Sequence, residues 1–161
     1  MPRKWGIPRA REHINTFDNR HRFHLGIFTR DTGKFIGFYS IIFKPRPKLA
    51  TGNICIGDTD HRGLDSAKEI SLAIMAFAYG TLDAAKCSAI IKGINLASIT
   101  LTRQLGLKRE GRLRKHAIGV NGKLIDVFHY GLLREEWESR DDTDGLLASE
   151  PEVYEPITAV K

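Results

Sequence analysis

The sequence contains little cysteine and no long hydrophobic run. Among its 161 residues are only two cysteines and two tryptophans. With so few thiols, a small disulfide-rich secreted scaffold is excluded. No apolar segment approaches the roughly 20 residues that a membrane-spanning helix requires, and none follows the charged first residues as it would in a secretory signal. The sequence therefore predicts a soluble, cytoplasmic protein with no membrane partner.

The cysteines and histidines do not show the sequence spacing of metal ligands. Cys55 and Cys87 both lie in strand-like apolar runs, so we expect two reduced, buried side chains rather than a disulfide. The six histidines are scattered without the spacing of metal ligands. The sequence therefore predicts no metal site.

Charge is divided unevenly along the chain. Residues 1–134 hold 23 lysines and arginines against 10 acidic residues, whereas residues 135–161 hold 2 against 9. We expect one domain over residues 1–137 and an acidic, flexible tail over 138–161, although this tail could also lie across the basic body. Aromatic residues are not interleaved with the basic ones, so a nucleic-acid partner is not favoured.

Periodicity predicts a mixture of strands and helices, an α/β (α+β) fold. Alternating apolar residues indicate a hairpin over 23–43 and a third strand over 53–57. A helix over 66–79 is apolar nearly all round, with a stripe at Ile70, Ala73, Ile74 and Phe77, and is expected to pack on a sheet. The remaining expected elements are a short helix over 8–17 anchored by Ile14 and Phe17, a strand over 87–91, a helix over 97–105, and a hairpin over 107–133 turned at 121–122.

Four motifs occur in a fixed order. The strand ending Ile-Gly-Asp at 56–58 runs through a short loop into the helix that starts near Ser66, and a helix N-terminus after a loop is an anion site. Next come Asn95 and Ser98, then Gln-Leu-Gly-Leu-Lys-Arg-Glu-Gly at 104–111, and finally Asn-Gly-Lys-Leu-Ile-Asp at 121–126.

Over roughly residues 22–137 these motifs resemble the GNAT superfamily of acetyl-CoA-dependent N-acetyltransferases. Strings of the type IGD-x-x-x-RGxG-x-A, N-x-x-S, LGF-x-x-EG and NG-x-x-x-D recur in this order in its ribosomal-protein N-terminal and polyamine acetyltransferases. The resemblance implies a mixed, mostly antiparallel sheet flanked by helices, with acetyl-CoA as co-substrate and a primary amine as acceptor.

The resemblance also implies where the cofactor binds. Asp65 stands where the family has a second glycine, so its carboxylate would repel a pyrophosphate unless it caps the helix instead. Arg103 would lie near the ribose phosphate. The implied cofactor-binding residues are Cys55, Ile56, Gly57, Arg62, Gly63, Leu64, Asp65, Ser66, Ala67, Lys68, Asn95, Ser98 and Arg103.

The catalytic residues follow from the same resemblance. Ser98 would hydrogen-bond the leaving thiolate, because the position where many relatives carry an acidic tyrosine holds Thr102 here. Asn95 would line the same gap, or simply cap the following helix. An alkylamine near pKa 10 must lose a proton before it attacks. Asp58 and Asp126 are the leading bases, each with a purely structural role as its alternative, ahead of Asp60, His61 and His129.

The family domain usually begins with a strand and helix for which this sequence has no room, so we expect an N-terminally shortened fold. An exposed sheet edge invites pairing with another chain. We therefore expect a homodimer or larger homo-oligomer, with 23–29 or 124–133 at the interface. The expected function is acetyl transfer to a protein N-terminus, a polyamine or another small amine. The alternative is a degenerate binding or assembly module without catalysis.

Overall fold

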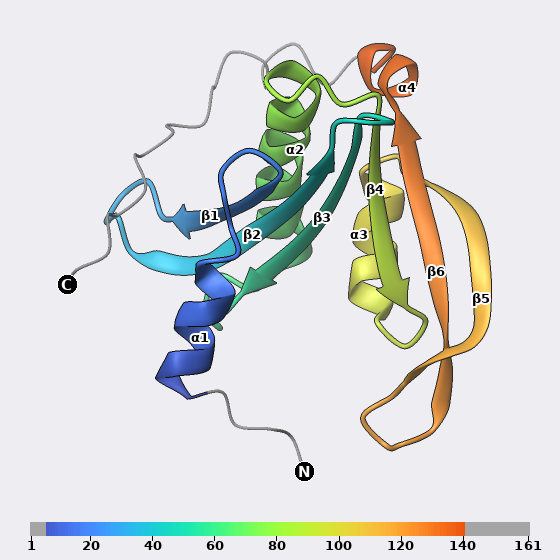
Figure 1. Cartoon of the computed structure of the whole chain (residues 1–161), viewed down its shortest axis with the longest axis horizontal. Helices are drawn as coiled ribbons and strands as arrows, with labels where there is room; N and C mark the ends of the chain where they lie inside the picture. Colours follow the sequence, from blue (N-terminus) through green and yellow to red (C-terminus); the bar gives the residue numbers. More distant parts are fainter. Residues whose placement is uncertain (1–5, 141–161) are drawn as a thin grey trace.

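The structure is a computed structural model that describes residues 6–140; residues 141–161, most of the expected acidic tail, lie outside the described residues. The chain forms six strands and four helices over the described part (Figure 1). In order these are α1 (Ile7–Ile14), β1 (Arg22–Phe28), β2 (Phe35–Lys44), β3 (Leu49–Ile56), α2 (Leu64–Gly80), β4 (Lys86–Lys92), α3 (Leu96–Gln104), β5 (Lys108–Ile118), β6 (Leu124–Leu133) and α4 (Arg134–Glu138).

The strands form one sheet in the order β1-β2-β3-β4-β6-β5. Every neighbouring pair is antiparallel except β3 and β4, which are parallel. The expected mixed, mostly antiparallel sheet flanked by helices is therefore confirmed. The outer strands are β1 and β5, whereas β6 lies between β4 and β5 with its backbone paired on both sides.

The parallel pair comes apart after three residues. Leu49, Ala50 and Thr51 of β3 pair with Lys86, Cys87 and Ser88 of β4, and beyond them the two strands carry no further pairing. Both strands continue for several residues and diverge toward the lower end of the molecule in Figure 1. The sheet thus contains a wedge-shaped gap between its two halves.

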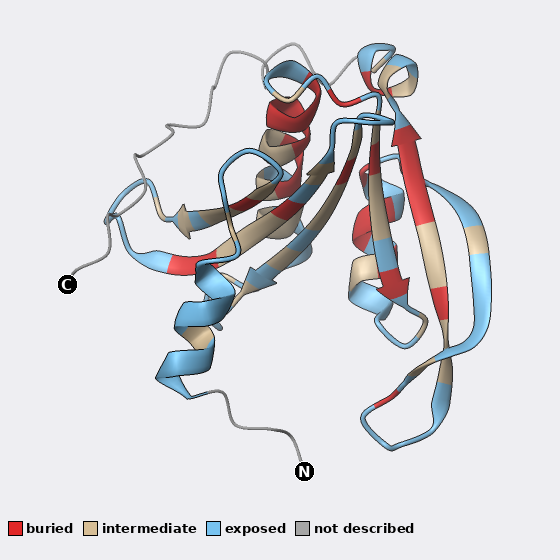
Figure 2. Cartoon of the chain, in the orientation of Figure 1, coloured by how far each residue is buried: buried red, intermediate tan, exposed pale blue. Residues whose placement is uncertain are grey.

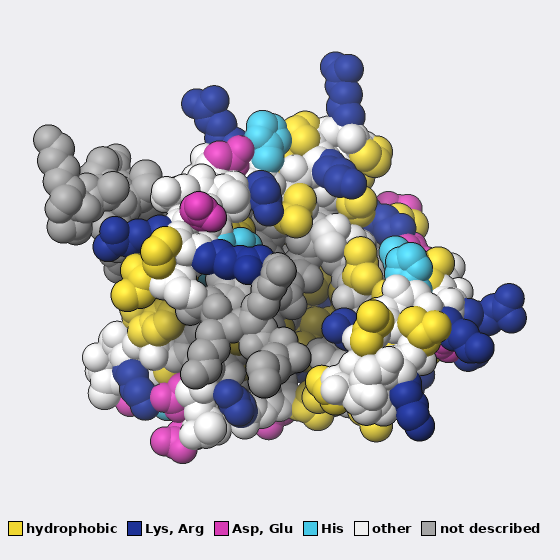
Figure 3. Space-filling model, turned by 60° about the horizontal axis from the view of Figure 1, so that its bottom comes forward, with side chains coloured by type: hydrophobic (Ala, Val, Ile, Leu, Met, Phe, Trp, Pro, Cys, Tyr) yellow, Lys and Arg dark blue, Asp and Glu magenta, His cyan; other side chains and the backbone are white. Residues whose placement is uncertain are grey.

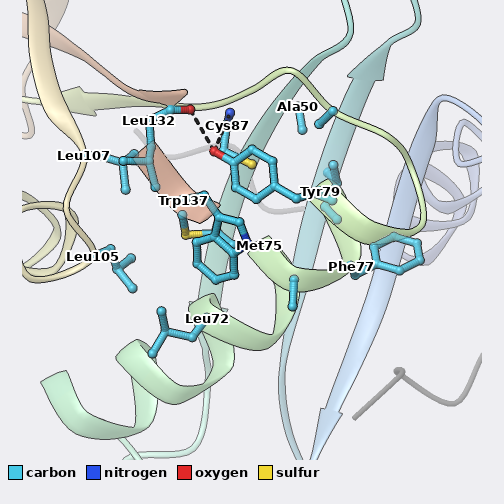
Figure 4. Close-up of a cluster of buried hydrophobic side chains, with 14 of the residues drawn as sticks. Ala50, Leu72, Met75, Phe77, Tyr79, Cys87, Leu105, Leu107, Leu132 and Trp137 are labelled. Atoms are coloured by element: carbon cyan, nitrogen blue, oxygen red, sulfur yellow. Dashed lines mark hydrogen bonds between the residues drawn. The ribbon is translucent and has the colours of Figure 1, made fainter. Parts of the chain in front are cut away.

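The hydrophobic core lies where α2 and α3 pack on the sheet, as the buried residues in Figure 2 show. On α2 the buried residues include Leu72, Met75, Ala76 and Tyr79, which share one face at helical spacing (Figure 4). Of the expected stripe only Phe77 is buried. Because α2 is apolar nearly all round, its periodicity alone did not identify the face that meets the sheet.

Two local expectations are wrong. The first helix, α1, ends at Ile14 and buries no residue, and Ile14 is 56% exposed rather than an anchor. Phe17 lies beyond the helix and packs on His24 with ring centroids 4.6 Å apart. Cys55 is exposed, because strand alternation turns Ile54 toward the core and Cys55 to the opposite face. Cys87 is buried, as expected, and both thiols are free.

Membrane insertion through a helix finds no support within residues 6–140. No helix in this part of the chain has both the length and the hydropathy to cross a bilayer.

Candidate active site

A cavity of about 430 Å³ fills the gap between the diverging strands. Its walls come from β2, β3, β4, α2 and α3, and are mostly apolar. Polar groups are contributed by Asn53, Ser88, Asn95 and Ser98, and Lys92 is the one charged residue of the lining among the described residues. Figure 3 views the molecule toward the open end of the gap, where hydrophobic side chains gather around a hollow.

Asn95 and Ser98 meet at the start of α3. Asn95 is the N-cap, and its Oδ1 accepts a hydrogen bond of 3.2 Å from the backbone N–H of Ser98. This capping role, one of the two alternatives from the sequence, is confirmed. Both residues also line the cavity. The cap therefore holds the Ser98 backbone at the cavity wall, while the catalytic roles of both residues stay predictions.

By the resemblance, Thr102 occupies the position at which many relatives carry a tyrosine. It is 5% exposed, and its hydroxyl lies 2.6 Å from the carbonyl oxygen of Ser98 and 3.0 Å from that of Ile99. The single hydroxyl proton is thus committed to carbonyls of the preceding helical turn. Thr102 is not free to protonate a leaving thiolate.

Asp58, which follows β3, is held in an ion pair outside this cavity. Its carboxylate accepts from Lys34 Nζ at 2.5 Å and lies 3.0 Å from Nδ1 of His61. The hydrogen bond from Lys34, followed by that from His61, holds the pKa of Asp58 far below its usual range. A general base works best with a pKa near the working pH. Asp58 stays a predicted base, with a weak proton affinity.

Asp126 in β6 also has structural partners. It accepts from the backbone N–H of Lys115 at 2.8 Å and from Arg112 Nε at 2.7 Å. These bonds, the backbone one first, lower the pKa of Asp126. Lys115 has a φ of +52° and lies within a register shift of β5, so the carboxylate stabilises an irregular segment of the hairpin. Its role as a base stays a prediction too.

The N-terminus of α2 is open to an anion. Its N-cap is Gly63, and no side chain caps it. Asp65 is the second residue of the helix, so the alternative in which Asp65 caps the helix is wrong. Arg62 is turned back onto the strand: its Nε donates a hydrogen bond of 3.0 Å to the carbonyl oxygen of Ile56, and its Nη2 donates one of 3.0 Å to that of Gly57. Backbone N–H groups at the helix start are therefore left for a ligand.

The other expected cofactor residues fall into two groups, one at this helix start and one elsewhere in the fold. Leu64, Ser66, Ala67 and Lys68 form its first turns, and Arg103 is exposed in the last turn of α3. Cys55 and Gly57 line a second hollow of about 300 Å³ together with Asp58. The structure thus brings Asn95 and Ser98 into the main cavity and leaves Asp58 outside it.

Sequence reasoning missed Tyr39, which also lines the cavity. In β2 it lies opposite Ile54, but its ring crosses to Gly52 of β3. A Cβ atom at Gly52 would lie only 2.3 Å from the Tyr39 hydroxyl. Since the strand pattern does not reveal which strands become neighbours, only the sheet register places this phenol.

Comparison with known protein families identifies a domain family for the first two thirds of the chain. A family model described as an acetyltransferase (GNAT) domain matches residues 3–108. An uncharacterized N-acetyltransferase derived from the SPbeta prophage of Bacillus subtilis strain 168 is 32% identical over 109 residues, which are 68% of this chain. The chain spans about half, 52%, of the length of that relative.

Solved structures share the fold. A spermidine N-acetyltransferase from Vibrio cholerae in complex with CoA and spermine superposes with a TM-score of 0.76 at 18% identity, covering 86% of this chain and 80% of that one. A dodecameric structure of spermidine N-acetyltransferase from Vibrio cholerae gives a TM-score of 0.71 at 18% identity, covering 84% and 76%.

Proposed function

The chain belongs to the acetyltransferase (GNAT) domain family, and from this premise we propose that it transfers an acetyl group from acetyl-CoA to a primary amine by direct attack in a ternary complex. One observation carries the proposal: the cavity between β3 and β4 lies beside α2, whose N-terminus has no side-chain cap. A pyrophosphate at that N-terminus would leave the pantetheine arm free to extend into the gap.

The strands support this placement of the arm. After Thr51, residues of β3 have no partner on β4, so their backbone groups on that side are available to the amides of the arm. The apolar walls suit the methylene groups of the arm, and the closed end of the gap limits how far it extends. The thioester then lies near the point where the strands begin to pair.

The reaction in this arrangement is a simple acyl transfer. The amine nitrogen forms a bond to the thioester carbon, and the carbonyl π electrons move to its oxygen. When the carbonyl re-forms, the carbon–sulfur bond breaks and its electron pair leaves on the sulfur of CoA. The proton lost by the amine ends on that thiolate or in solvent, and Ser98, which lines the cavity, would hydrogen-bond the sulfur.

Water is the proton acceptor that the cavity favours. Among the described residues, no carboxylate contributes to the cavity wall, and both Asp58 and Asp126 are already ion-paired. A chain of waters along Asn53, Ser88 and Ser98 would carry the proton to the surface.

The proposed acceptor is either a polyamine or a peptide N-terminus. Polyamines are suggested by the structural likeness to spermidine acetyltransferases, while the cavity lining with Lys92 and no described carboxylate suits an acceptor with a single positive charge, such as a peptide N-terminus. Spermidine and short peptides, offered at equal concentration, would distinguish them by which one releases CoA faster.

Cofactor binding tests the proposed function without an acceptor. A rise in melting temperature that grows with acetyl-CoA concentration is expected, because the ligand binds only the native state. The CoA thiol released in the presence of amines then measures transfer. No rise at millimolar acetyl-CoA would instead support the degenerate module, which the exposed Asp65 in the first turn of α2 favours.

A further inference from the structure

Resting on the proposed function, we propose that Tyr39 is a catalytic residue whose hydroxyl donates a hydrogen bond to the thioester carbonyl oxygen of acetyl-CoA. Tyr39 comes from β2, one strand away from the gap, yet it lines the cavity. Its place in the sheet register and the chemistry of its phenol support this assignment.

The hydroxyl lies at the closed end of the gap. Thr51 is the last residue of β3 that pairs with β4, and Gly52 follows it directly. The Tyr39 ring lies over Gly52, with its oxygen 2.3 Å from the position that a Cβ atom of residue 52 would take. A cofactor arm that enters from the N-terminus of α2 carries its thioester at its far end. That far end meets Tyr39.

The hydroxyl is also free to act. Among the described residues it has no hydrogen-bond partner, in contrast to the hydroxyls of Thr51 and Ser88, which lie 2.8 Å apart and bond each other. A polar group in a largely apolar cavity gains stability from any partner that a ligand supplies. The thioester carbonyl is an acceptor of the right kind.

The other hydroxyls expected at the site do not serve the thioester carbonyl. The Thr102 hydroxyl donates to backbone carbonyl oxygens of α3, so it is not available to hydrogen-bond the reacting atoms. Ser98 lies at the first turn of α3, where it suits the departing sulfur. The carbonyl oxygen, on which negative charge first develops, would otherwise have no side-chain donor from these positions.

The phenol acts by hydrogen bonding rather than by proton transfer. Burial, with a smaller contribution from Cys87, raises the pKa of Tyr39, so the phenol keeps its proton throughout the physiological range. A thiolate, whose conjugate acid has a pKa of about 8.5, is too weak a base to remove it. The hydrogen bond strengthens as the oxygen becomes negative, which lowers the barrier to attack.

The test compares acetyl-CoA with CoA, which lacks the carbonyl. Isothermal titration of the whole chain gives a Kd for each, and the ratio of CoA to acetyl-CoA dissociation constants isolates the acetyl group. In Tyr39→Phe this ratio should fall about 2- to 10-fold, the loss of one hydrogen bond. Turnover with an accepted amine should fall about 10- to 1000-fold with little change in KM for the amine.

Two further variants sharpen the result. Tyr130→Phe in β6 removes the phenol oxygen of a residue that does not line the cavity, and its ratio should equal that of the wild type. Gly52→Ala places a methyl group within 2.3 Å of the Tyr39 oxygen and so displaces an unaltered tyrosine; it should lower the ratio as Tyr39→Phe does.

The outcomes separate the two levels of the proposal. If the wild type binds acetyl-CoA but Tyr39→Phe keeps both the ratio and kcat, this inference is overturned and the proposed function stands. If the wild type binds neither ligand, the proposed function fails and this inference fails with it.

Discussion

The hydroxyl of Tyr79 donates a hydrogen bond of 2.7 Å to the carbonyl oxygen of Leu132 and accepts one of 3.2 Å from the backbone N–H of Cys87 (Figure 4). Cys87 and Leu132 are direct partners in β4 and β6. A single phenol at the end of α2 therefore ties the helix to two strands. The contact therefore joins α2 and β4, both of which contribute walls of the cavity.

Replacing Tyr79 with phenylalanine should lower the free energy of unfolding by about 1–3 kcal/mol, because the Leu132 carbonyl and the Cys87 N–H lose a buried partner. Urea denaturation measures the change. Tyr39→Phe is the matched control, since its hydroxyl has no partner among the described residues and its loss should cost little. Equal destabilisation by the two variants would contradict this assignment.

Asp65→Asn should tighten acetyl-CoA binding, because it removes a negative charge from the first turn of the helix at which the pyrophosphate would bind. Arg62→Ala should weaken binding, both by loss of charge and by release of the loop from Ile56 and Gly57. Isothermal titration gives both constants. Weaker binding by Asp65→Asn would mean that this carboxylate maintains the shape of the loop.

Ser98→Ala should reduce kcat more than it raises KM for acetyl-CoA, since a hydrogen bond to the thiolate forms only as charge develops on sulfur. Ser98→Thr keeps a hydroxyl and should retain most of the turnover. Steady-state measurement of CoA release gives kcat and KM, and these distinguish stabilisation of the thiolate from positioning of the cofactor. A change confined to KM would reassign Ser98 to positioning of the cofactor.

His24 should make the stability of the fold depend on pH near neutrality. Its ring lies between Phe17 and Phe38, with Nδ1 2.9 Å from Ser40 Oγ, and burial, followed by repulsion from His13, lowers its pKa below 6.5. Below that value the unfolded chain takes up a proton that the folded chain resists.

The free energy of unfolding should therefore be level above about pH 7 and decline as the pH falls through 6.5 toward the lower pKa of the folded state. In His24→Gln this part of the decline should disappear. Urea unfolding of both proteins between pH 5 and 8 checks it. If the free energy of unfolding depends on pH equally in the two proteins, the proton taken up on unfolding binds a group other than His24.

Self-association should use an outer strand of the sheet. At the β1 edge, the side chains of Phe28 and Phe35 are 56% and 57% exposed, and their ring centroids lie 5.4 Å apart. We expect a homodimer or larger assembly in light scattering, and Phe28→Asp should dissociate it. Leu113→Asp on β5, the opposite edge, is the control. Dissociation by the control alone would place the interface at β5, and a wild-type monomer at micromolar concentration would contradict the prediction.

The sequence alone determined the family, the order of the elements and the first contacts of the site. Turn residues and alternation sufficed for the hairpins, because β-strand periodicity and Asn-Gly turns are local properties. Asn95 was identifiable as a cap from its residue type and its place before an apolar run. The loop around Gly63 indicated a helix start by the same local logic, and its role as an anion site stays a prediction.

Only the tertiary structure decided which groups share the cavity. Asp58 pairs with Lys34 in the turn between β1 and β2, and Asp126 pairs with Arg112 in β5. Because these partners are distant in the sequence, sequence reasoning did not reveal that both carboxylates are engaged. The buried face of α2 was ambiguous because the helix is apolar nearly all round. Tyr39 reaches the cavity through strand register, and register depends on long-range pairing and packing that no local pattern encodes.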